Sequence, residues 1–373
     1  MRIAYLLTSL GIGGAERQTL AIAAGMAARG HTVAILVLRP PLPEEWPTTL
    51  PVHHLNLLKN PISLFAAFFR ARRFLRKFHP DLIHSHSFHA NMLARLVKTA
   101  APAQLVSTIH NVYEGGRLRM LAYRLTDFLS TRTTAVSSAA AQRFVLLKAV
   151  PQNKITVIPN AIDTAEFSPN PARRTQTRAA LSAPHASSSL ANFIWLAAGR
   201  IVPAKDFPNL LRAFAIVHAA HPAAQLCIAG QPTSPEFERL QALAQSLNLG
   251  PSLQFLGLRQ DIPALLDAAD AFVLSSAWEG MPLVLAEAMA MEKPIVATDV
   301  GGVRELLADT ARIVPPGNPQ ALAAATLDLM QTRSEVLHAQ AQAARIRIQA
   351  HFNLEARVAQ WESLYASLIQ PKS

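Results

Sequence analysis

The stretch SSAWEGMPLVLAEAMAM, from Ser275 to Met291, is the part of this chain around which its fold can be predicted. It follows the short apolar run Ala271 to Leu274, which is typical of a buried strand, and it turns at Glu279-Gly280. Pro282 then favours a helix start, because proline at the first helical position gives up no hydrogen bond there. The stretch therefore predicts a strand, a turn and a helix in succession.

The start of this predicted helix is suited to bind a phosphate group. The N–H groups of Met281, Leu283 and Val284 have no partner within such a helix, and helix N-termini attract anions. Glu279 in the turn and Glu287 two turns into the helix can both border whatever binds there. A phosphate site beside two acceptors suits a nucleotide sugar, which carries a diphosphate and several hydroxyls. An amphipathic helix with solvated glutamates is the alternative.

Length and charge set the broad class. The chain has 373 residues, half of them hydrophobic and 16% charged, so two domains could each bury a core. The formal net charge of +11 indicates an anionic partner such as nucleic acid, an acidic membrane or a phosphorylated substrate. The single cysteine, Cys227, excludes an internal disulfide and is consistent with a reducing cytosol. No apolar run approaches the length that spans a bilayer, so we expect a soluble or peripheral protein.

The N-terminal segment predicts the beginning of a doubly wound sheet. Apolar runs at Ile3 to Thr8 and Val33 to Leu38 flank a predicted helix from Glu16 to Arg29. Gly13 and Gly14 follow the first strand, at the edge where open α/β sheets bind ligands. They do not form the G-x-G-x-x-G fingerprint, and a plain strand-to-helix turn explains them equally well.

A basic amphipathic helix is predicted between Leu64 and His79. Phenylalanine, leucine, arginine and lysine recur there at helical spacing, a pattern found in helices that lie on acidic membranes. A surface helix that packs its phenylalanines on the sheet explains the same pattern without lipid. Both interpretations stay open at this point.

Histidines lie at the ends of two predicted strands. The spacing of His84, His86 and His89 fits no familiar zinc pattern, so we expect no metal site there. His110 follows the strand Leu105 to Ile109 and should face the ligand edge of a parallel sheet. It could hydrogen-bond a sugar hydroxyl or manage a proton, and a purely structural histidine is equally consistent.

A second domain is predicted after a linker at 168–190. This segment is rich in proline, serine, threonine and alanine, which is typical of a linker. The strand Phe193 to Ala198 is followed by Arg200 and Lys205, two cations in one loop that could converge on a diphosphate. Two solvated cations are the alternative. Gly230 follows the next predicted strand.

Together these motifs resemble family 4 of the retaining glycosyltransferases. In chain order the matching features are Gly13-Gly14, His110, Asn160 to Asp163, Gly199 to Asp206, Glu279 to Glu287 and a closing helix at Phe352 to Leu368. The resemblance covers nearly the whole chain. It implies the GT-B fold, an α/β architecture of two Rossmann-like, doubly wound domains facing across a cleft. The implied domains are an acceptor-side domain at 1–167, closed by a helix at 352–373, and a nucleotide-sugar-binding domain at 191–351.

The resemblance also implies an activity: transfer of a hexose-type sugar, with retention, from a nucleoside-diphosphate sugar to a hydroxyl of a glycan or lipid-linked acceptor. The implied catalytic residues are His110, Arg200, Lys205 and Glu279. The implied donor-binding residues are Gly13, Gly14, Arg200, Lys205, Gly230, Glu279, Gly280, Met281, Pro282, Leu283, Val284 and Glu287. No metal or other cofactor is expected, because cations and helix N–H groups can stabilise the leaving diphosphate and the chain has no Asp-x-Asp pair.

Two other functions stay open: a nucleotide-sugar 2-epimerase on the same fold, and a basic, non-catalytic nucleic-acid-binding protein. The second is disfavoured because the basic residues are scattered and stacking aromatics are scarce. We expect as partners a UDP- or GDP-linked sugar, a glycan or lipid-linked acceptor of cell-envelope polysaccharide or lipopolysaccharide synthesis, and an anionic membrane, but no nucleic acid. The N-terminus does not have the pattern of a secretion signal, so we expect a cytoplasmic protein, peripheral on the inner face of the plasma membrane.

Overall fold

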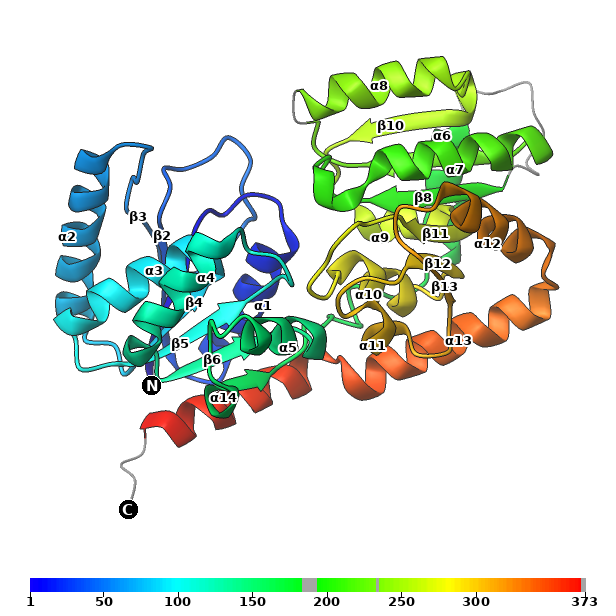
Figure 1. Ribbon diagram of the computed structural model, residues 1–373. Coiled ribbons are helices and arrows are strands. Elements are labelled where there is room, and N and C mark those ends of the chain that lie inside the picture. Colours follow the sequence, from blue (N-terminus) through cyan, green and yellow to red (C-terminus); the bar gives the residue numbers. More distant parts are fainter. Residues whose placement is uncertain (183–192, 233–234, 370–373) are drawn as a thin grey trace. The chain divides into compact units, whose positions relative to one another are not determined.

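The computed structural model describes residues 1–182, 193–232 and 235–369. The chain divides into two compact units, Met1–Ala161 with Leu354–Ser373, and Ile162–Asn353. Each unit contains one sheet of parallel strands with helices packed against it (Figure 1). The predicted α/β class, with two doubly wound domains, is confirmed. The units change over at Ala161/Ile162 and Asn353/Leu354, a few residues from the predicted boundaries at 167 and 352.

The sheet of the first unit has seven strands in the order β3-β2-β1-β4-β5-β6-β7. Their bounds are β1 Arg2–Leu7, β2 Thr32–Val37, β3 Val52–His54, β4 Leu82–His86, β5 Gln104–Ile109, β6 Arg132–Ala135 and β7 Ile155–Val157. β1 pairs with both β2 and β4, so the strand order reverses between β1 and β4. Such a topological switch point is where open α/β sheets bind ligands, beyond the carboxyl ends of the strands.

The helices of the first unit are α1 Gly14–Ala28, α2 Pro61–Phe78, α3 Ser87–Val97, α4 Arg117–Thr126, α5 Ser138–Leu146 and α14 Leu354–Ile369. The C-terminal helix α14 packs Trp361 and Tyr365 into the same buried cluster as β1 and α1. The predicted closing helix therefore exists and belongs to the first unit, although residues 370–373 lie outside the described part of the chain.

A buried hydrogen-bond chain ties α14 to the sheet. Tyr365 Oη lies 2.6 Å from His84 Nδ1, and Tyr5 Oη lies 3.3 Å from Tyr365 Oη. On the other side of the His84 ring, Nε2 lies 2.7 Å from Thr108 Oγ1. Both ring nitrogens of His84 are thus occupied within the protein, which gives this residue a structural part.

We expect Tyr365→Phe to lower the free energy of unfolding by about 1–3 kcal/mol, because it leaves a buried imidazole nitrogen without its partner. Urea unfolding of the full-length protein measures this change. The matched control is Tyr113→Phe, because the Tyr113 side chain is 48% exposed and surface changes usually stay within about 0.5 kcal/mol. An equal loss of unfolding free energy in both variants would contradict the stabilising role of the buried hydrogen-bond chain.

The basic helix α2 presents two phenylalanines to solvent. Ala67, Ala71 and Leu75 form its buried face, whereas Phe65 and Phe69 are 68% and 60% exposed. The suggestion that this helix packs its phenylalanines on the sheet is therefore wrong for these two, because small residues four apart occupy that face instead. Within the described ranges, no helix is both long and apolar enough to cross a bilayer.

The sheet of the second unit has six strands in the order β10-β9-β8-β11-β12-β13. Their bounds are β8 Ile194–Ala198, β9 Gln225–Ala229, β10 Leu253–Gly257, β11 Ala271–Leu274, β12 Ile295–Thr298 and β13 Arg312–Val314. The switch point lies between β8 and β11, which pair directly. Cys227 is buried in β9.

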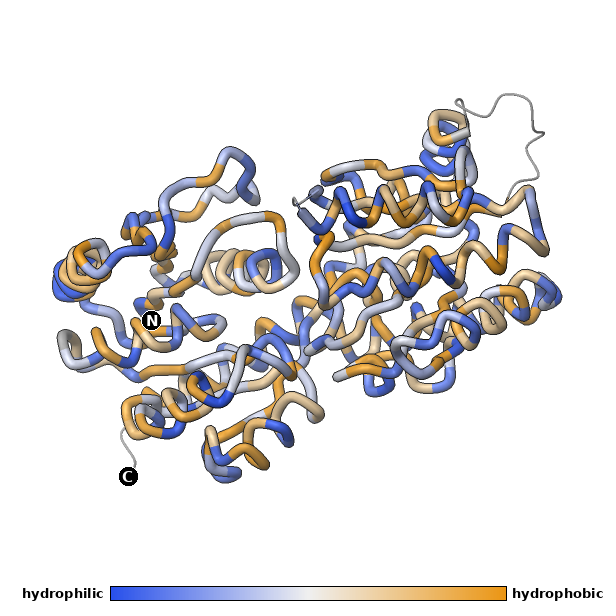
Figure 2. The backbone as a smooth tube through the Cα atoms, turned by 45° about the horizontal axis from the view of Figure 1, so that its top comes forward, coloured by the Kyte–Doolittle hydropathy of each residue, from blue (hydrophilic) through white to orange (hydrophobic). Residues whose placement is uncertain are grey.

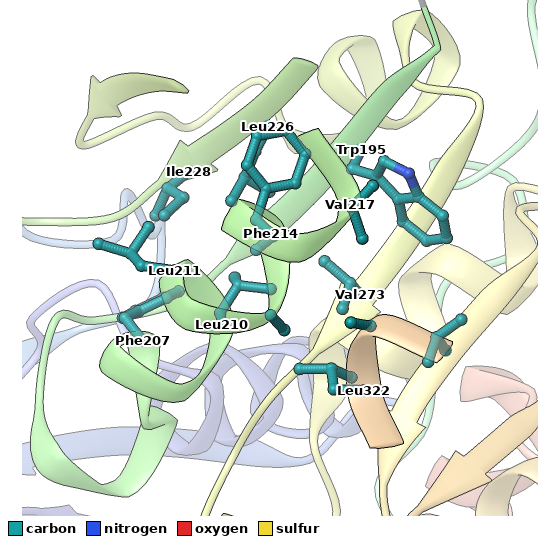
Figure 3. Packing of buried hydrophobic residues seen from close by; sticks show 14 of the residues in the cluster. Trp195, Phe207, Leu210, Leu211, Phe214, Val217, Leu226, Ile228, Val273 and Leu322 are labelled. Atoms are coloured by element: carbon teal, nitrogen blue, oxygen red, sulfur yellow. The ribbon is translucent and has the colours of Figure 1, made fainter. Parts of the chain in front are cut away.

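The helices of the second unit enclose this sheet. They are α6 Pro171–Ser182, α7 Phe207–Ala220, α8 Glu236–Ser246, α9 Ile262–Ala268, α10 Leu283–Ala290, α11 Val303–Leu307, α12 Pro319–Gln331 and α13 Ser334–His351. α7 packs Phe207, Leu211 and Phe214 against Leu226 and Ile228 of β9 (Figure 3). Within the turns of many helices hydrophobic and hydrophilic residues alternate, as expected of helices with one buried face (Figure 2).

Helix α6 occupies part of the predicted linker. Its arginines form ion pairs with α9 and the residue before β11: Arg173 with Asp267, and Arg174 and Arg178 with Asp270 at 2.6 and 2.9 Å. The linker prediction is therefore wrong for 171–182, which pack on the second unit, while 183–190 lie outside the described residues. Composition misled here because the partners of these arginines lie far along the chain and only the fold brings them close.

Candidate functional site

Two loops at the switch point of the second sheet carry most of the predicted site residues. One loop follows β8 and contains the 3-10 turn η5 Pro203–Lys205, and the other joins β11 to α10. Two hydrogen bonds hold the loops together: Ala277 N–H donates to Ala204 O at 2.9 Å, and Ser275 Oγ donates to Lys205 O at 2.9 Å. Because β8 and β11 are neighbours, segments far apart in sequence meet at one edge of the sheet.

Lys205 and Glu279 form an ion pair at this edge. Lys205 Nζ lies 2.6 Å from Glu279 Oε1, and the same oxygen accepts a hydrogen bond from Ser276 Oγ at 2.8 Å. The side chains of Lys205 and Glu279 are only 18% and 11% exposed. A cation and an acceptor thus lie one hydrogen bond apart, within reach of a ligand that carries both a phosphate and hydroxyls.

Three glycines let the backbones around this pair approach closely. A Cβ on Gly230 would lie 2.1 Å from Gly199 O, and a Cβ on Gly199 would lie 2.9 Å from Lys205 Cε. Gly301, at φ +55°, passes so close to the other loop that a Cβ there would lie 2.1 Å from Glu279 O. Gly199 and Gly301 were not among the predicted site residues, because a glycine shows its need for space only when its neighbours are known.

Helix α10 begins at Leu283, one residue later than predicted. Pro282 is its N-cap, and its ψ of 113° keeps it extended instead of helical. The N–H groups of Leu283 and Val284 have no acceptor within the helix, as at any helix start. Glu287 lies in the second turn and is buried, as is Met281 just before the helix. The predicted helix start is therefore present, with Gly280 and Pro282 leading into it, and its binding of an anion stays a prediction.

Arg200 differs from Lys205 in its surroundings. It follows β8 directly and is exposed. Within the described part of the chain its guanidinium makes no ion pair, so it is available to an anionic ligand.

The remaining predicted residues belong to the first unit. Gly13 is the N-cap of α1 and Gly14 its first residue, at the carboxyl end of β1. Gly13 O accepts a hydrogen bond from Trp46 Nε1 at 3.3 Å. His110 follows β5, and its Nε2 lies 2.9 Å from Nδ1 of His86, the last residue of β4. The roles assigned to these residues from sequence stay predictions.

Burial keeps three neighbouring histidines of the first unit, His84, His86 and His110, neutral at pH 7. Burial lowers the pKa of His110 to about 4. Burial, together with the neighbouring histidines, also holds the pKa of His84 and that of His86 well below 6.5. His110 is therefore a neutral imidazole at pH 7.

Glu114 is a residue of this site that the sequence analysis missed. Its Oε1 accepts from the backbone N–H of His110 at 3.1 Å, and its Oε2 accepts from Tyr123 Oη at 2.6 Å. Burial raises the pKa of Glu114 to about 7. No sequence signal marks it, because its partner Tyr123 is brought close by the packing of α4.

Stability should depend on pH through Glu114. Its folded pKa of about 7 lies above the ordinary value of 4.5, so its contribution to stability is complete below pH 4.5 and is lost as the pH rises to 7. As the pH rises from 4.5 to 7, we expect the free energy of unfolding of Glu114→Gln to increase by on the order of 3 kcal/mol relative to that of wild type. Urea unfolding at several pH values measures this difference.

His84, His86 and His110 change the stability in the opposite direction, because a pKa that is lower in the folded state makes the stability rise with pH. They are present in both proteins, so their contribution cancels in the difference. A difference between Glu114→Gln and wild type that stays constant from pH 4.5 to 7 would contradict this assignment.

Comparisons with known proteins identify the family. The Glycosyltransferase Family 4 model matches residues 12–166, and the model for glycosyl transferases group 1 matches residues 186–347. Together the two matches span most of both units. This chain is a family 4 glycosyltransferase.

Two relatives and one solved structure illustrate the similarity. The glycosyltransferase is 26% identical over 273 residues to the uncharacterized glycosyltransferase MJ1059 of Methanocaldococcus jannaschii. This matching region covers 68% of this chain and 64% of that protein. It is 25% identical over 335 residues to the UDP-Gal:alpha-D-GlcNAc-diphosphoundecaprenol alpha-1,3-galactosyltransferase of Escherichia coli, covering 86% and 82% of the two chains. The chain spans just under two thirds of the first relative and most of the second.

The solved structure is that of Anabaena Alr3699/HepE in complex with UDP and glucose. It superposes with a TM-score of 0.86 at 21% identity, covering 98% of this chain and 99% of that one. This likeness confirms the GT-B fold of the glycosyltransferase, and the family models confirm the predicted enzyme class.

Proposed function

We propose that this glycosyltransferase moves a hexose from a nucleoside-diphosphate sugar to a hydroxyl of a glycan or lipid-linked acceptor, with retention at the anomeric carbon. The observation that carries the proposal is the Lys205–Glu279 ion pair at the switch point of the second sheet, near the start of α10. A cation, a carboxylate and a helix N-terminus are the groups that bind a diphosphate joined to a sugar.

Breaking the anomeric bond builds negative charge on the departing diphosphate. Lys205, Arg200 and the N–H groups of Leu283 and Val284 stabilise this charge in the proposed mechanism. The other donor contacts follow the same logic: Glu279 accepts from sugar hydroxyls, Glu287 from the ribose, and Gly230, Gly280, Met281 and Pro282 let the backbone approach the nucleotide. In this proposed arrangement, no metal ion is needed to stabilise the charge on the diphosphate.

Retention requires that the acceptor attack from the face that the diphosphate leaves. In the proposed mechanism the diphosphate takes the proton of the acceptor hydroxyl, so no side chain is assigned as a covalent nucleophile. Gly13 and Gly14 offer backbone close to β1, and neutral His110 hydrogen-bonds the transferred sugar.

The class of donor and acceptor is proposed from the relatives. The E. coli relative is named for a UDP-linked galactose and a diphosphoundecaprenol-linked acceptor, and the HepE crystal contains UDP and glucose. We therefore favour a UDP-linked hexose over a GDP-linked one, and a lipid-linked acceptor of cell-envelope polysaccharide or lipopolysaccharide synthesis.

A lipid-linked acceptor would require contact with a membrane, and α2 provides a suitable surface. Ile62, Phe65 and Phe69 are 82%, 68% and 60% exposed. The exposed cations on the same helix are Arg70, Arg73, Arg76 and Lys77. Exposed apolar and cationic side chains on one helix favour peripheral binding to an anionic bilayer.

A thermal-shift panel tests the donor site. UDP, GDP, ADP and their sugars are added, with EDTA present, to wild type, Lys205→Ala and Arg239→Ala, the last being an exposed cation of α8. We expect one nucleotide to raise the Tm of wild type and Arg239→Ala by mass action, and to raise that of Lys205→Ala less. Equal shifts in all three proteins, or no shift with any nucleotide, would contradict the proposed site.

Turnover distinguishes the transferase from the epimerase. A transferase releases free nucleotide only when an acceptor is present, whereas interconversion of two nucleotide sugars without acceptor would establish the epimerase. Steeply salt-dependent binding to arbitrary DNA would favour the nucleic-acid-binding alternative.

A further inference from the structure

A small cavity at the switch point of the first sheet is lined by two buried polar atoms without partners. His86 Nε2 and Gln18 Nε2 have no hydrogen-bond partner among the described residues, and the two residues are only 5% and 7% exposed. Both line a cavity of about 10 Å³, together with Ile22, Thr108 and other residues of the first unit. This volume is close to the minimum for one water molecule, which needs two or more polar partners.

The orientation of the Gln18 amide follows from its other hydrogen bond. Gln18 Oε1 accepts from the backbone N–H of Ala161 at 2.8 Å. Of the two polar atoms of the Gln18 amide, only the oxygen can accept a hydrogen bond from the Ala161 N–H group. The amide nitrogen, with its two N–H donors, is therefore the atom without a partner.

We propose that one water molecule occupies this cavity and completes a one-way hydrogen-bond chain that holds the proton of His110 on Nδ1. Gln18 Nε2 donates to the water, the water donates to His86 Nε2, His86 Nδ1 donates to His110 Nε2, and His110 presents an N–H donor at Nδ1. Gln18 and His86 act as positioning residues. The consequence for the sugar, which rests on the proposed function, is that His110 donates a hydrogen bond to it and does not take up a proton.

The direction of the chain follows from counting donors and acceptors. The 2.9 Å contact between His86 Nδ1 and His110 Nε2 requires one proton between the two nitrogens, because both rings are neutral. If His110 supplied that proton, His86 would carry its own proton on Nε2, and the water would face two donors, His86 and Gln18. Its own two O–H groups would then lack these partners. A water molecule can accept two hydrogen bonds, so both unpartnered atoms are satisfied in either direction. In the opposite direction, however, the water accepts from Gln18 and donates to His86, so only one of its O–H groups lacks a partner among these residues instead of two.

The first test locates the protons directly. Full-length protein with nitrogen-15-labelled histidine is studied at pH 7 by proton–nitrogen correlation spectra that distinguish Nδ1–H from Nε2–H rings, with His110→Gln and His86→Asn used to assign signals. We expect both His86 and His110 to carry their proton on Nδ1. A proton on Nε2 of His110 overturns the proposal. This readout needs neither donor nor acceptor, so it stands or falls separately from the transferase activity.

The second test changes the group that faces the water. Gln18→Glu keeps an oxygen for the Ala161 N–H but replaces the donor toward the water with an acceptor. At pH 9, where the new carboxyl is ionised, the water can donate one O–H to the carboxylate and the other to His86 Nε2, so we expect the His110 proton to stay on Nδ1, with thermal melting confirming that the variant is folded. A proton on Nε2 of His110 in this variant, or a high-resolution crystal structure of the wild type with a dry cavity, overturns the role of the water.

The third test uses two variants of His86 that differ in one donor. The side-chain amide of His86→Asn can place an N–H near the position of Nδ1, whereas His86→Leu cannot. If the transferase assay succeeds, we expect His86→Leu to lower kcat/KM by about five- to tenfold, the equivalent of one hydrogen bond, and His86→Asn to restore most of it. Equal losses in the two variants would indicate a packing role and overturn the relay.

Discussion

Replacing Lys205 with alanine is expected to lower turnover by about a hundredfold or more, because loss of one charge-stabilising donor commonly costs that much. Lys205 Nζ is positioned by Glu279 Oε1 at 2.6 Å, and its stem lies against Gly199. The same loss is expected for Glu279→Ala, which removes the proposed acceptor for sugar hydroxyls and leaves Lys205 without its partner. Initial rates of nucleotide release, with donor and acceptor present, measure the effect.

Two further variants make this result specific. Arg239→Ala removes an exposed cation from the same unit and should leave the rate near that of wild type. Glu279→Gln keeps an oxygen that can accept from Ser276 but removes the charge facing Lys205, so it should fall between wild type and Glu279→Ala. Near-normal rates in Lys205→Ala or Glu279→Ala would show that this pair does not act on the donor.

Gly301→Ala is expected to reduce turnover at least tenfold and to destabilise the second unit. A methyl group there would lie 2.1 Å from Glu279 O, so the loop that carries Glu279 must move. Displacement of a substrate-positioning group by about 1 Å can cost up to a hundredfold in rate. Gly301 also has a φ of +55°, which adds about 1 kcal/mol for any residue with a side chain.

Gly317→Ala is a matched control for this variant. Gly317 has a similar φ of +65°, but nothing lies within 4 Å of the position that its Cβ would take. The Gly317→Ala variant should lose only about 1 kcal/mol of unfolding free energy, from the unfavourable backbone conformation, as measured by urea unfolding, and its turnover should stay unchanged. Equal changes in both variants would mean that backbone conformation, and not contact with the Glu279 loop, explains the result.

The class of fold could be predicted from the sequence because its signals are local. Buried parallel strands are short apolar runs, and glycine or proline marks the turns between strand and helix, so β1, β5, β8 and β11 were predicted within one or two residues. The loops after these strands were also predicted to carry the site. Carboxyl ends of parallel strands meet at one edge of a sheet whatever the other details are.

Contacts between distant segments could not be predicted in this way. Lys205 and Glu279 are 74 residues apart, and their ion pair depends on β8 and β11 becoming neighbours. The arginines of α6 resembled those of a linker until α9 and Asp270 supplied their partners.

In the first unit, too, the sequence predicts the position of a residue in its strand but not its contacts with distant segments. The position of His110 at the end of a strand follows from the chain itself, but its contacts with His86, Glu114 and the cavity beside Gln18 depend on strand order and helix packing. Local periodicity and turn chemistry set the elements and the edge at which ligands bind. Which side chains pair, and which protons they hold, depends on long-range packing and burial, which are properties of the folded chain alone.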